Sequence, residues 1–209
     1  ERKMEQVRQL LDRMGIVTRE SVAAEKVAGG FSSLYPILRA LEDSGQIRRG
    51  YFIEGLGAAQ FAAPGADERL RNLATRDGGE HARTFILSAV DPASPFGSLI
   101  PCPDTCHQNI PKPQRVAGAT VFVRDGFPLG YLNRTQDTLT TFLQGNQHDP
   151  RIRGAAPALA ASIGELARQR GPVLLTSIDG ISASQSEVAP EFVSAGFQTS
   201  SSGLRHPGV

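Results

Sequence analysis

Three short helices followed at once by a glycine-turned hairpin are the feature that most constrains what this chain can fold into. Apolar residues at helical spacing, in runs interrupted by glycines, predict helices over residues 4–14, 18–27 and about 32–44. The stretch SGQIRRGYFIEGLGAAQF follows, in which two apolar runs flank the turn Glu54–Gly57. This pattern predicts a β-hairpin with strands over 46–53 and 58–62. The element order is that of a winged helix-turn-helix unit, and a three-helix unit with a hairpin cover is the alternative.

The polar segment TRDGGEHAR, residues 75–83, marks a change in composition and predicts a domain boundary. We therefore expect a winged-helix domain over residues 1–75 and a second module over residues 84–209. The chain begins at Glu1 without a start methionine, so we also expect the native chain to be longer.

The second module reads as mixed α+β. An apolar run at 84–90 predicts a buried strand, and 116–143 predicts a meander with a hairpin turn at Asp125–Gly126. The other expected elements are a helix from about 156 to 170, a strand over 173–178, a helix over 184–195 capped by Ser184 and Glu187, and a strand over 197–204. The expected fold class is α+β, with this module forming a small barrel or a curled antiparallel sheet.

Composition restricts how the chain can bind a polyanion. Its 209 residues include 22 Lys and Arg against 21 Asp and Glu, a net charge of +1, so any attraction to DNA must be local. No run is long and apolar enough to cross a bilayer, and two cysteines fit a reducing compartment better than a disulfide scaffold. We therefore expect a cytoplasmic globular protein with no membrane partner.

Motifs of nucleotide-binding enzymes are missing from the sequence, which has no P-loop and no G-x-G-x-x-G after a strand. The zinc-protease motif H-E-x-x-H and the hydrolase motif G-x-S-x-G are also missing. No cofactor is therefore expected in this part of the parent protein. The motif PCPDTCH brings Cys102, Cys106 and His107 together, but not at a common zinc-finger spacing. A fourth ligand, such as His81 or His148, would be needed, so we expect two free thiols and no metal.

The candidate nucleic-acid contacts lie on the third helix and at the base of the hairpin. Hydroxyl and guanidinium groups near a helix N-terminus are natural phosphate donors. The candidates are Ser32, Ser33, Tyr35, Arg39, Arg48 and Arg49. In the alternative interpretation this surface is a solvated face, with Tyr35 covering the edge of the core.

Acidic residues limit where the hairpin can approach DNA. Glu42, Asp43 and the turn residue Glu54 would repel phosphates, so Arg48 and Arg49 are expected to be the hairpin's only phosphate contacts. The hairpin residues expected to pack in the core or an interface are Tyr51, Phe52, Ile53 and Phe61.

Two carboxylates are weak catalytic candidates. Asp91 and Asp179 each follow an expected strand, where an Asp can serve as a general base or stabilise a cation. Asp before Pro or Gly more often caps a turn, which is the favoured interpretation for both.

The segment Gly15 to Arg71, GIVTRESVAAEKVAGGFSSLYPILRALEDSGQIRRGYFIEGLGAAQFAAPGADERLR, closely resembles the last winged-helix domain of the bacterial large helicase-related (Lhr) family. These proteins are ATP-dependent DNA helicases of superfamily 2. VDPASPFGSLIP resembles the family's next strand and loop, RVAGATVFVRDGFPLGYLNR its barrel meander, and LLTSIDGISASQSEVAPEFVSAGFQTSSSGLR its C-terminal end. The resemblance therefore runs in order through nearly the whole chain.

This resemblance implies a DNA-repair helicase whose ATPase core, using ATP and Mg²⁺, lies upstream. The implied partners are DNA, the upstream helicase and winged-helix domains of the same chain, and further copies of the protein. It also implies uracil-DNA glycosylase activity for some members and similarity to winged-helix glycosylases that unhook crosslinked bases. The latter use a Q-x-Q motif, which Gln144–Gln147 does not match, and the C-terminus GLRHPGV holds no acid. Catalytic residues therefore stay unassigned.

Three functions remain open at this point. The first is a non-catalytic DNA-binding and assembly module of a helicase. The second is a contribution to a uracil-type glycosylase site, with Asp179 or Asp91 as the carboxylate. The third is a module for protein interaction or oligomerisation only.

Overall fold

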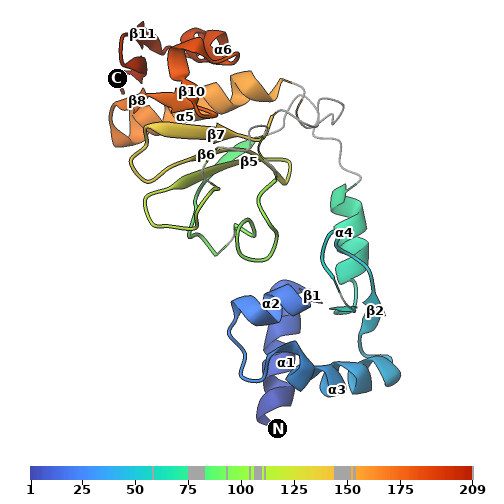
Figure 1. Ribbon diagram of the computed structural model, residues 1–209. Coiled ribbons are helices and arrows are strands. Elements are labelled where there is room, and N and C mark those ends of the chain that lie inside the picture. Colours follow the sequence, from blue (N-terminus) through green and yellow to red (C-terminus); the bar gives the residue numbers. More distant parts are fainter. Residues whose placement is uncertain are drawn as a thin grey trace. The chain divides into compact units, whose positions relative to one another are not determined.

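The computed structural model divides the chain into two compact units, whose elements are labelled in Figure 1. It describes residues 1–57, 59–74, 83–92, 94–103, 105, 110, 112–143, 152 and 154–208. The first unit is Glu1–Asp77 with Ser98–Ile100, and the second is Gly78–Gly97 with Pro101–Val209. Several residues discussed above lie outside the described part, namely Gly78, Gly79, His81, Cys106, His107, Gln144, Gln147 and His148.

The first unit contains the expected helices and hairpin, together with one short strand that the sequence did not indicate. Its elements are α1 (Arg2–Met14), β1 (Ile16–Val17), α2 (Arg19–Ala24), α3 (Gly30–Asp43), β2 (Arg48–Gly50), β3 (Gln60–Ala62) and α4 (Ala66–Ala74). The strands form an antiparallel sheet in the order β1-β3-β2. The added strand β1 extends the hairpin into a three-stranded sheet by pairing Val17 with Phe61.

Leucine side chains join the helices of the first unit. Leu10 and Leu11 of α1 and Leu34, Leu38 and Leu41 of α3 are buried in one core, which also takes in Val22 of α2 and Phe61 of β3. Apolar burial of this kind is the main force that holds short helices in place, since isolated helices of this length are marginal in water.

Local signals fix the start of α2. Thr18 and Ser21 form a reciprocal capping box, in which the Ser21 N–H donates to Thr18 Oγ1 at 3.1 Å and the Thr18 N–H donates to Ser21 Oγ at 2.9 Å. The expected N-cap at Thr18 is therefore confirmed.

The third helix begins earlier than expected, at Gly30 rather than at Ser32 or Ser33. Gly29 precedes it with φ 80°, and a Cβ there would lie 2.8 Å from the Cβ of Ser33. Only glycine fits this position without strain. The early start leaves Pro36 inside the helix, where it cannot donate to the carbonyl of Ser32.

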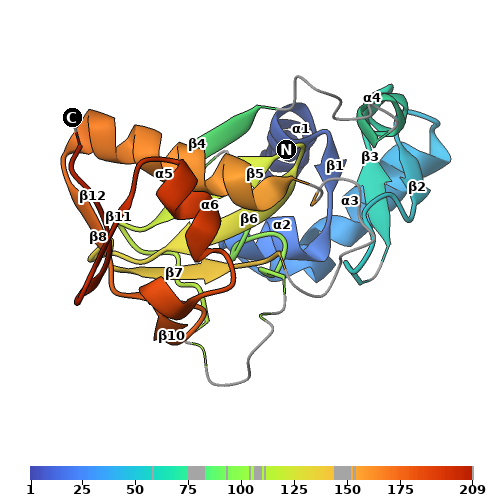
Figure 2. The same cartoon turned by 90° about the horizontal axis from the view of Figure 1, so that it is seen from above.

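The second unit contains two sheets and two α-helices in its described part. Its elements are β4 (Thr84–Ser88), β5 (Thr120–Arg124), β6 (Phe127–Leu132), β7 (Thr138–Thr141), α5 (Ala155–Arg170), β8 (Val173–Leu175), β9 (Ser177–Ile178), β10 (Ile181–Ser182), the 3₁₀ turn Ala183–Gln185, α6 (Ala189–Ser194), β11 (Gln198–Ser200) and β12 (Gly203–His206). One sheet has the order β10-β9-β7-β6-β5-β4 and the other β11-β12-β8. Figure 2 shows α5 lying across the larger sheet, where the apolar side chains of Leu159, Ile163 and Leu166 are buried.

The α+β class is confirmed, but the described strands of the larger sheet do not close into a barrel. β4 and β10 are its two edges, and β7 pairs in parallel with β9, so the sheet is open and mixed rather than purely antiparallel. A curled sheet is compatible with this arrangement.

Three of the expected elements differ in detail. The strand expected over 173–178 splits, because β8 pairs with β12 while β9 pairs with β7 in the other sheet. The strand expected over 197–204 is instead the hairpin of β11 and β12. The capping box expected at Ser184 does not form, since α6 begins at Ala189 after Val188 without a side-chain cap.

The prediction that the strand over 84–90 is buried was also wrong in part. β4 lies at the edge of its sheet, and the side chain of Phe85 is 58% exposed. An edge strand has a neighbour on one side only, so a continuous apolar run does not guarantee burial.

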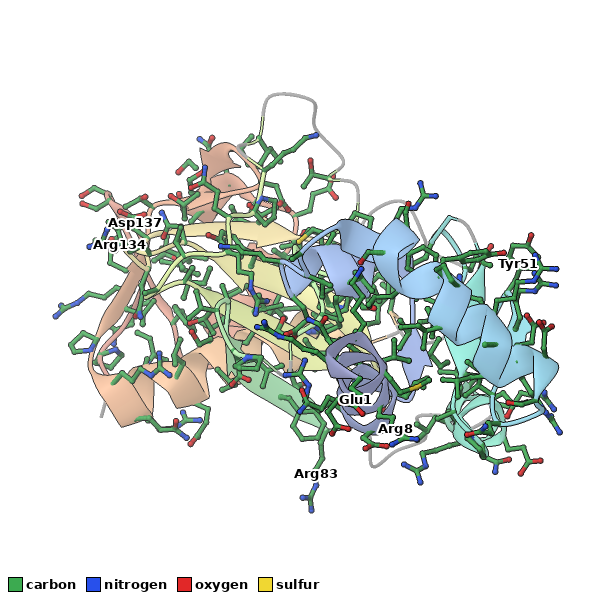
Figure 3. The ribbon with its side chains drawn as sticks, turned by 90° about the horizontal axis from the view of Figure 1, so that it is seen from below. Glu1, Arg8, Tyr51, Arg83, Arg134 and Asp137 are labelled. Carbon is green, nitrogen blue, oxygen red and sulfur yellow. The ribbon has the colours of Figure 1, made fainter. Side chains whose placement is uncertain are left out.

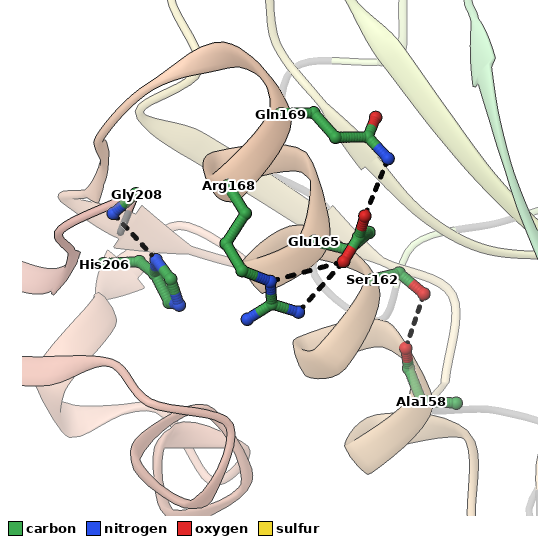
Figure 4. Close-up of polar contacts among 7 residues, drawn as sticks. All are labelled: Ala158, Ser162, Glu165, Arg168, Gln169, His206 and Gly208. Carbon is green, nitrogen blue, oxygen red and sulfur yellow. Dashed lines mark hydrogen bonds and ion pairs between the residues drawn. The ribbon is translucent and has the colours of Figure 1, made fainter.

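A buried histidine closes the C-terminal end of the core. His206 is 3% exposed, its Nδ1 accepts a hydrogen bond from the Gly208 N–H at 3.1 Å, and its ring meets that of Phe197 at 5.0 Å. Figure 4 shows the hydrogen bond between Gly208 and His206 beside the helix α5, on which Arg168 pairs with Glu165. Burial, and after it the charge of Arg168, lowers the pKa of His206.

His206 should therefore make the second unit sensitive to mild acid. The unfolded chain takes up a proton near the ordinary pKa of 6.5, whereas the folded chain does so only at lower pH. Stability from this group is complete above that value and is lost as the pH falls through the lowered folded pKa. Urea unfolding followed by circular dichroism at pH 7.5 and 5.5 should show this loss, and His206→Asn, which keeps an acceptor, should reduce it. An unchanged pH dependence in His206→Asn would contradict the assignment.

Candidate nucleic-acid interface

The helix α3 presents one face to the core and another to solvent. Leu34, Leu38 and Leu41 are buried. The exposed residues on the opposite side recur at helical spacing and are Ser32, Pro36, Arg39 and Asp43. Arg39 is the basic residue of this exposed row, and it has no ion-pair partner among the residues that the structure describes.

The N-terminus of α3 keeps its first backbone N–H groups free of any side-chain cap. Ser32 is exposed there, whereas the half-buried Ser33 donates from Oγ to the carbonyls of Ala28 at 3.1 Å and Gly30 at 2.9 Å. The Ser33 hydroxyl therefore fixes the start of the helix. The uncapped N–H groups and the helix dipole give this end a partial positive charge that suits an anion.

Tyr35 lies at the edge of the core. Its ring is half-buried, with centroids 6.0 Å from both Phe31 and Phe61. Among the six candidates, Tyr35 fits the alternative interpretation, in which it covers the core.

Both arginines at the base of the hairpin are held by carboxylates. Arg49 Nε lies 3.1 Å from Glu42 Oε1 on α3, and Arg48 Nη1 lies 3.2 Å from Asp67 Oδ2 on α4. Asp67 is buried and also pairs with Arg71 at 3.3 Å. The side chains of Arg48 and Arg49 are still 71% and 45% exposed, so each retains guanidinium surface that faces solvent.

These ion pairs orient the arginines more than they stabilise the fold, because exposed pairs contribute little. They also offset much of the local positive charge. The sequence did not indicate Asp67 as a partner, since the pairing depends on how α4 returns to the sheet.

The candidates form a row rather than a cluster. From Ser32 to Glu42, where Arg49 is held, the helix rises about 15 Å at 1.5 Å per residue. Along the axis of a duplex, one strand carries a phosphate for every rise of about 3.4 Å, so a row of this length can meet more than one phosphate of the same strand. The arrangement therefore suits contacts with successive backbone phosphates.

A buried glutamine organises the hairpin loop, and sequence reasoning missed it. Gln60 is 0% exposed, and its Oε1 accepts from the N–H groups of Phe52 and Ile53, both at 2.9 Å. Its Nε2 donates to the carbonyls of Ile53 at 2.9 Å and Leu56 at 3.2 Å. The strand ladder covers only Arg48–Gly50 against Gln60–Ala62, so this one amide replaces ladder hydrogen bonds in the loop beyond it. A polar residue inside an apolar strand was the available signal.

The hairpin's aromatic residues divide between core and solvent. Phe61 is fully buried, as expected, but Tyr51 is 87% exposed and does not pack in the core of its own unit. We refer to residues 51–57 as the wing loop.

In the second unit, the side chain of Asp179 stabilises the turn in which it lies. It is 7% exposed at φ 52°, and its carboxylate accepts from the N–H and the Oγ1 of Thr141, both at 2.6 Å. These bonds tie the turn between β9 and β10 to the end of β7. At the half-buried Asp91, the backbone carbonyl accepts from Arg115 Nη2 at 3.0 Å. Both observations fit turn-forming roles.

A polar pocket of about 410 Å³ lies beside the β6–β7 turn. Its lining includes Lys112, Arg134 and Thr138. Asp137 Oδ1 accepts hydrogen bonds from Asn133 at 2.8 Å, Thr135 at 2.8 Å and Thr138 at 3.0 Å. The bond from Asn133 contributes most to lowering the pKa of Asp137, so its carboxylate stays ionised. Figure 3 labels Arg134 and Asp137 on this turn.

Metal-ligating side chains do not gather in groups of three or more within the described residues. Cys102 carries a free thiol, and burial raises its pKa. None of the helices in the part that the structure describes is both long and apolar enough to span a bilayer.

The first unit is a winged-helix domain, because helices α1, α2 and α3 are followed by a hairpin that forms a three-stranded sheet with β1. A family model described as "Large helicase-related protein, winged-helix domain" matches residues 1–82. The chain is 46% identical over 133 residues to "Lhr helicase/uracil glycosylase" of Escherichia coli, covering 63% of this chain and 8% of that protein. It is 35% identical over 205 residues to "Lhr helicase/ probable uracil glycosylase" of Mycolicibacterium smegmatis, covering 94% of this chain and 13% of that protein.

The chain belongs to the Lhr family and corresponds to a C-terminal region of an Lhr-type helicase. It spans about a tenth of the length of these curated relatives, at 8% and 13%.

Replacing Gln60 should loosen the wing loop. Gln60→Leu leaves the backbone groups of Phe52, Ile53 and Leu56 without their partner, which should cost roughly 1–3 kcal/mol of unfolding free energy. Urea unfolding would measure this cost, and limited proteolysis would locate new cleavage within the wing loop. The matched control is Gln46→Leu, because Gln46 is exposed and its side-chain amide donates to the Ser44 hydroxyl rather than to the backbone. Equal stability and equal cleavage in the two variants would contradict this role for Gln60.

Proposed function

We propose that this chain is a DNA-binding and assembly module of a DNA-repair helicase. The observation that carries the proposal is a winged-helix domain of a helicase family whose α3 exposes, along one row, an uncapped N-terminus, Ser32 and Arg39, which has no ion-pair partner within the described residues. The name of each relative includes the word helicase, which supports a role beside a translocating motor.

In this proposal α3 and the hairpin base contact the phosphate backbone. The N-terminus of α3, with the Ser32 hydroxyl, receives one phosphate, Arg39 a second, and the solvent-facing guanidinium groups of Arg48 and Arg49 receive others. Ser33 supports this end of the helix through its own hydrogen bonds to Ala28 and Gly30. Tyr35 supports α3 from the core edge. Such contacts read no sequence, because phosphate geometry is the same for every base pair.

The second unit provides the assembly surface in this proposal. It would pack against other domains of the same parent chain or against a second copy of the protein. ATP and Mg²⁺ would be bound by the parent's helicase core, with no cofactor bound by this chain. We place the protein in the cytoplasm.

Removing Arg39 should weaken DNA binding at every sequence alike. Because few phosphates are neutralised, the unmodified chain should bind weakly, and its affinity should fall with salt at a shallow slope of about 0.9 per neutralised phosphate. In fluorescence anisotropy between 50 and 200 mM salt, Arg39→Gln should reduce the slope of log K against log salt by about 0.9. Arg168→Gln is the matched control, since it removes the same charge from an exposed arginine of the second unit.

Equal slopes for Arg39→Gln and Arg168→Gln would contradict contact by α3. If the unmodified chain binds no DNA even at low salt, the module is one for protein interaction only. Light scattering with and without DNA would then measure its self-association.

We also propose a second candidate, a contribution to uracil excision. The names of both relatives include uracil glycosylase, and Asp137, an ionised carboxylate, lies on the same β6–β7 turn as the pocket-lining residues Asn133 and Arg134. A glycosylase must flip out its base and stabilise a cationic sugar, which calls for such a group in a polar site. Asp137 suits this role better than Asp179, whose carboxylate is buried and bonded to Thr141.

Alkali cleavage of a uracil-containing strand tests this second function. Asp137→Asn should lower product formation, while Asp91→Asn and Asp179→Asn should leave it unchanged wherever thermal melting shows an intact fold. If Asp137→Asn forms as much product as the unmodified chain, Asp137 is not the catalytic carboxylate. If the unmodified chain forms no product, this chain does not excise uracil.

A further inference from the structure

Tyr51 is the most exposed large apolar residue in the described part of the chain. Its 87% exposure exceeds that of the next, Phe85 at 58%. The other two tyrosines differ, because Tyr35 is half-buried against Phe61, and Tyr131 is 8% exposed with its hydroxyl bonded to the Gln114 carbonyl at 2.9 Å. Figure 3 labels Tyr51 among side chains that project outward from the winged-helix unit.

The backbone on both sides of Tyr51 is held in place. On one side Gly50 pairs with Gln60 in the strand ladder. On the other, the N–H groups of Phe52 and Ile53 both donate to the buried Gln60 Oε1 at 2.9 Å. One amide and one strand pair therefore fix the residue between them.

The side chain of Phe52 takes the inner position and leaves the outer one to Tyr51. Its ring folds back over Gly50, where an added Cβ would lie 2.8 Å from the ring atom Cζ. A side chain added at position 50 would therefore have to displace this ring. A fixed backbone with a projecting ring is a preorganised contact surface, because binding need not order the loop.

The charges next to Tyr51 favour an anionic polymer. Arg48 and Arg49 precede it by three and two positions, respectively, and both keep guanidinium surface exposed to solvent. An aromatic ring beside cations is the combination that binds single strands, since bases stack on the ring while the cations contact phosphates. A paired base inside a duplex is already stacked on both faces and offers no free face.

We propose that Tyr51 is a stacking site for an unpaired nucleobase, so that the wing loop selects single-stranded DNA or the unpaired strand at a junction. This inference rests on the proposed DNA-binding function and assigns to the wing a ligand that α3 alone does not distinguish. Glu54, exposed further along the wing loop, keeps phosphates away from the tip and confines the strand to the side of the arginines.

Equilibrium binding to a single-stranded oligonucleotide and to a duplex of the same length tests the proposal. Tyr51→Ala should weaken single-strand binding by about 5- to 100-fold, the loss typical of one base–aromatic stack, and change duplex binding less than about 2-fold. Tyr51→Phe keeps the ring and should bind like the parent chain. Phe85→Ala is the matched control, because it removes an exposed aromatic ring from the second unit.

Fluorescence gives an independent reading of the same contact. The chain contains no tryptophan, so Tyr51→Trp introduces a single indole at this site. Its emission should be quenched by a single-stranded oligothymidine and not by the duplex.

The outcomes separate this inference from the function on which it rests. If Tyr51→Ala retains parental single-strand affinity, or loses single-strand and duplex binding equally, the stacking site is overturned while DNA binding by α3 stands. If the unmodified chain binds neither the single-stranded oligonucleotide nor the duplex, the proposed function fails and the stacking site fails with it.

Discussion

The hydrogen bonds of the Gln60 side chain are the interaction on which the shape of the wing depends. The hairpin has a short ladder, and beyond it the backbone at Phe52, Ile53 and Leu56 would have no partner without this buried amide. A buried polar group must be paired, so the loop and the amide fix one another. The outward position of Tyr51 and the close approach of Phe52 to Gly50 both depend on that arrangement.

The charge pattern of the first unit favours orientation over strong attraction. Arg48 and Arg49 are each tied to a carboxylate on a different helix, which holds their guanidinium groups at the base of the hairpin. Arg39 and the uncapped N-terminus of α3 continue the row away from the wing. In the proposed function, a module built this way adds only a modest contact with DNA, which agrees with the net charge of +1.

Much of the first unit could be predicted from sequence because its signals are local. Glycines interrupt the helices, Thr18 caps α2, and the leucine spacing of α3 defines its buried face. The pairings of Arg48 with Asp67 and of Gln60 with the loop backbone could not be predicted, since they join residues brought together only by folding. In the second unit the turn at Asp125–Gly126 was readable for the same local reason. By contrast, the split of residues 173–178 between two sheets depends on which strands lie beside them.

Amide chemical-shift mapping of the ¹⁵N-labelled chain with a short DNA carrying a single-stranded end tests the central claim most directly. The account predicts that shifted amides cluster at the start of α3, around Arg39 and along residues 48–57. Shifts confined to the second unit, or spread evenly over both units, would contradict it.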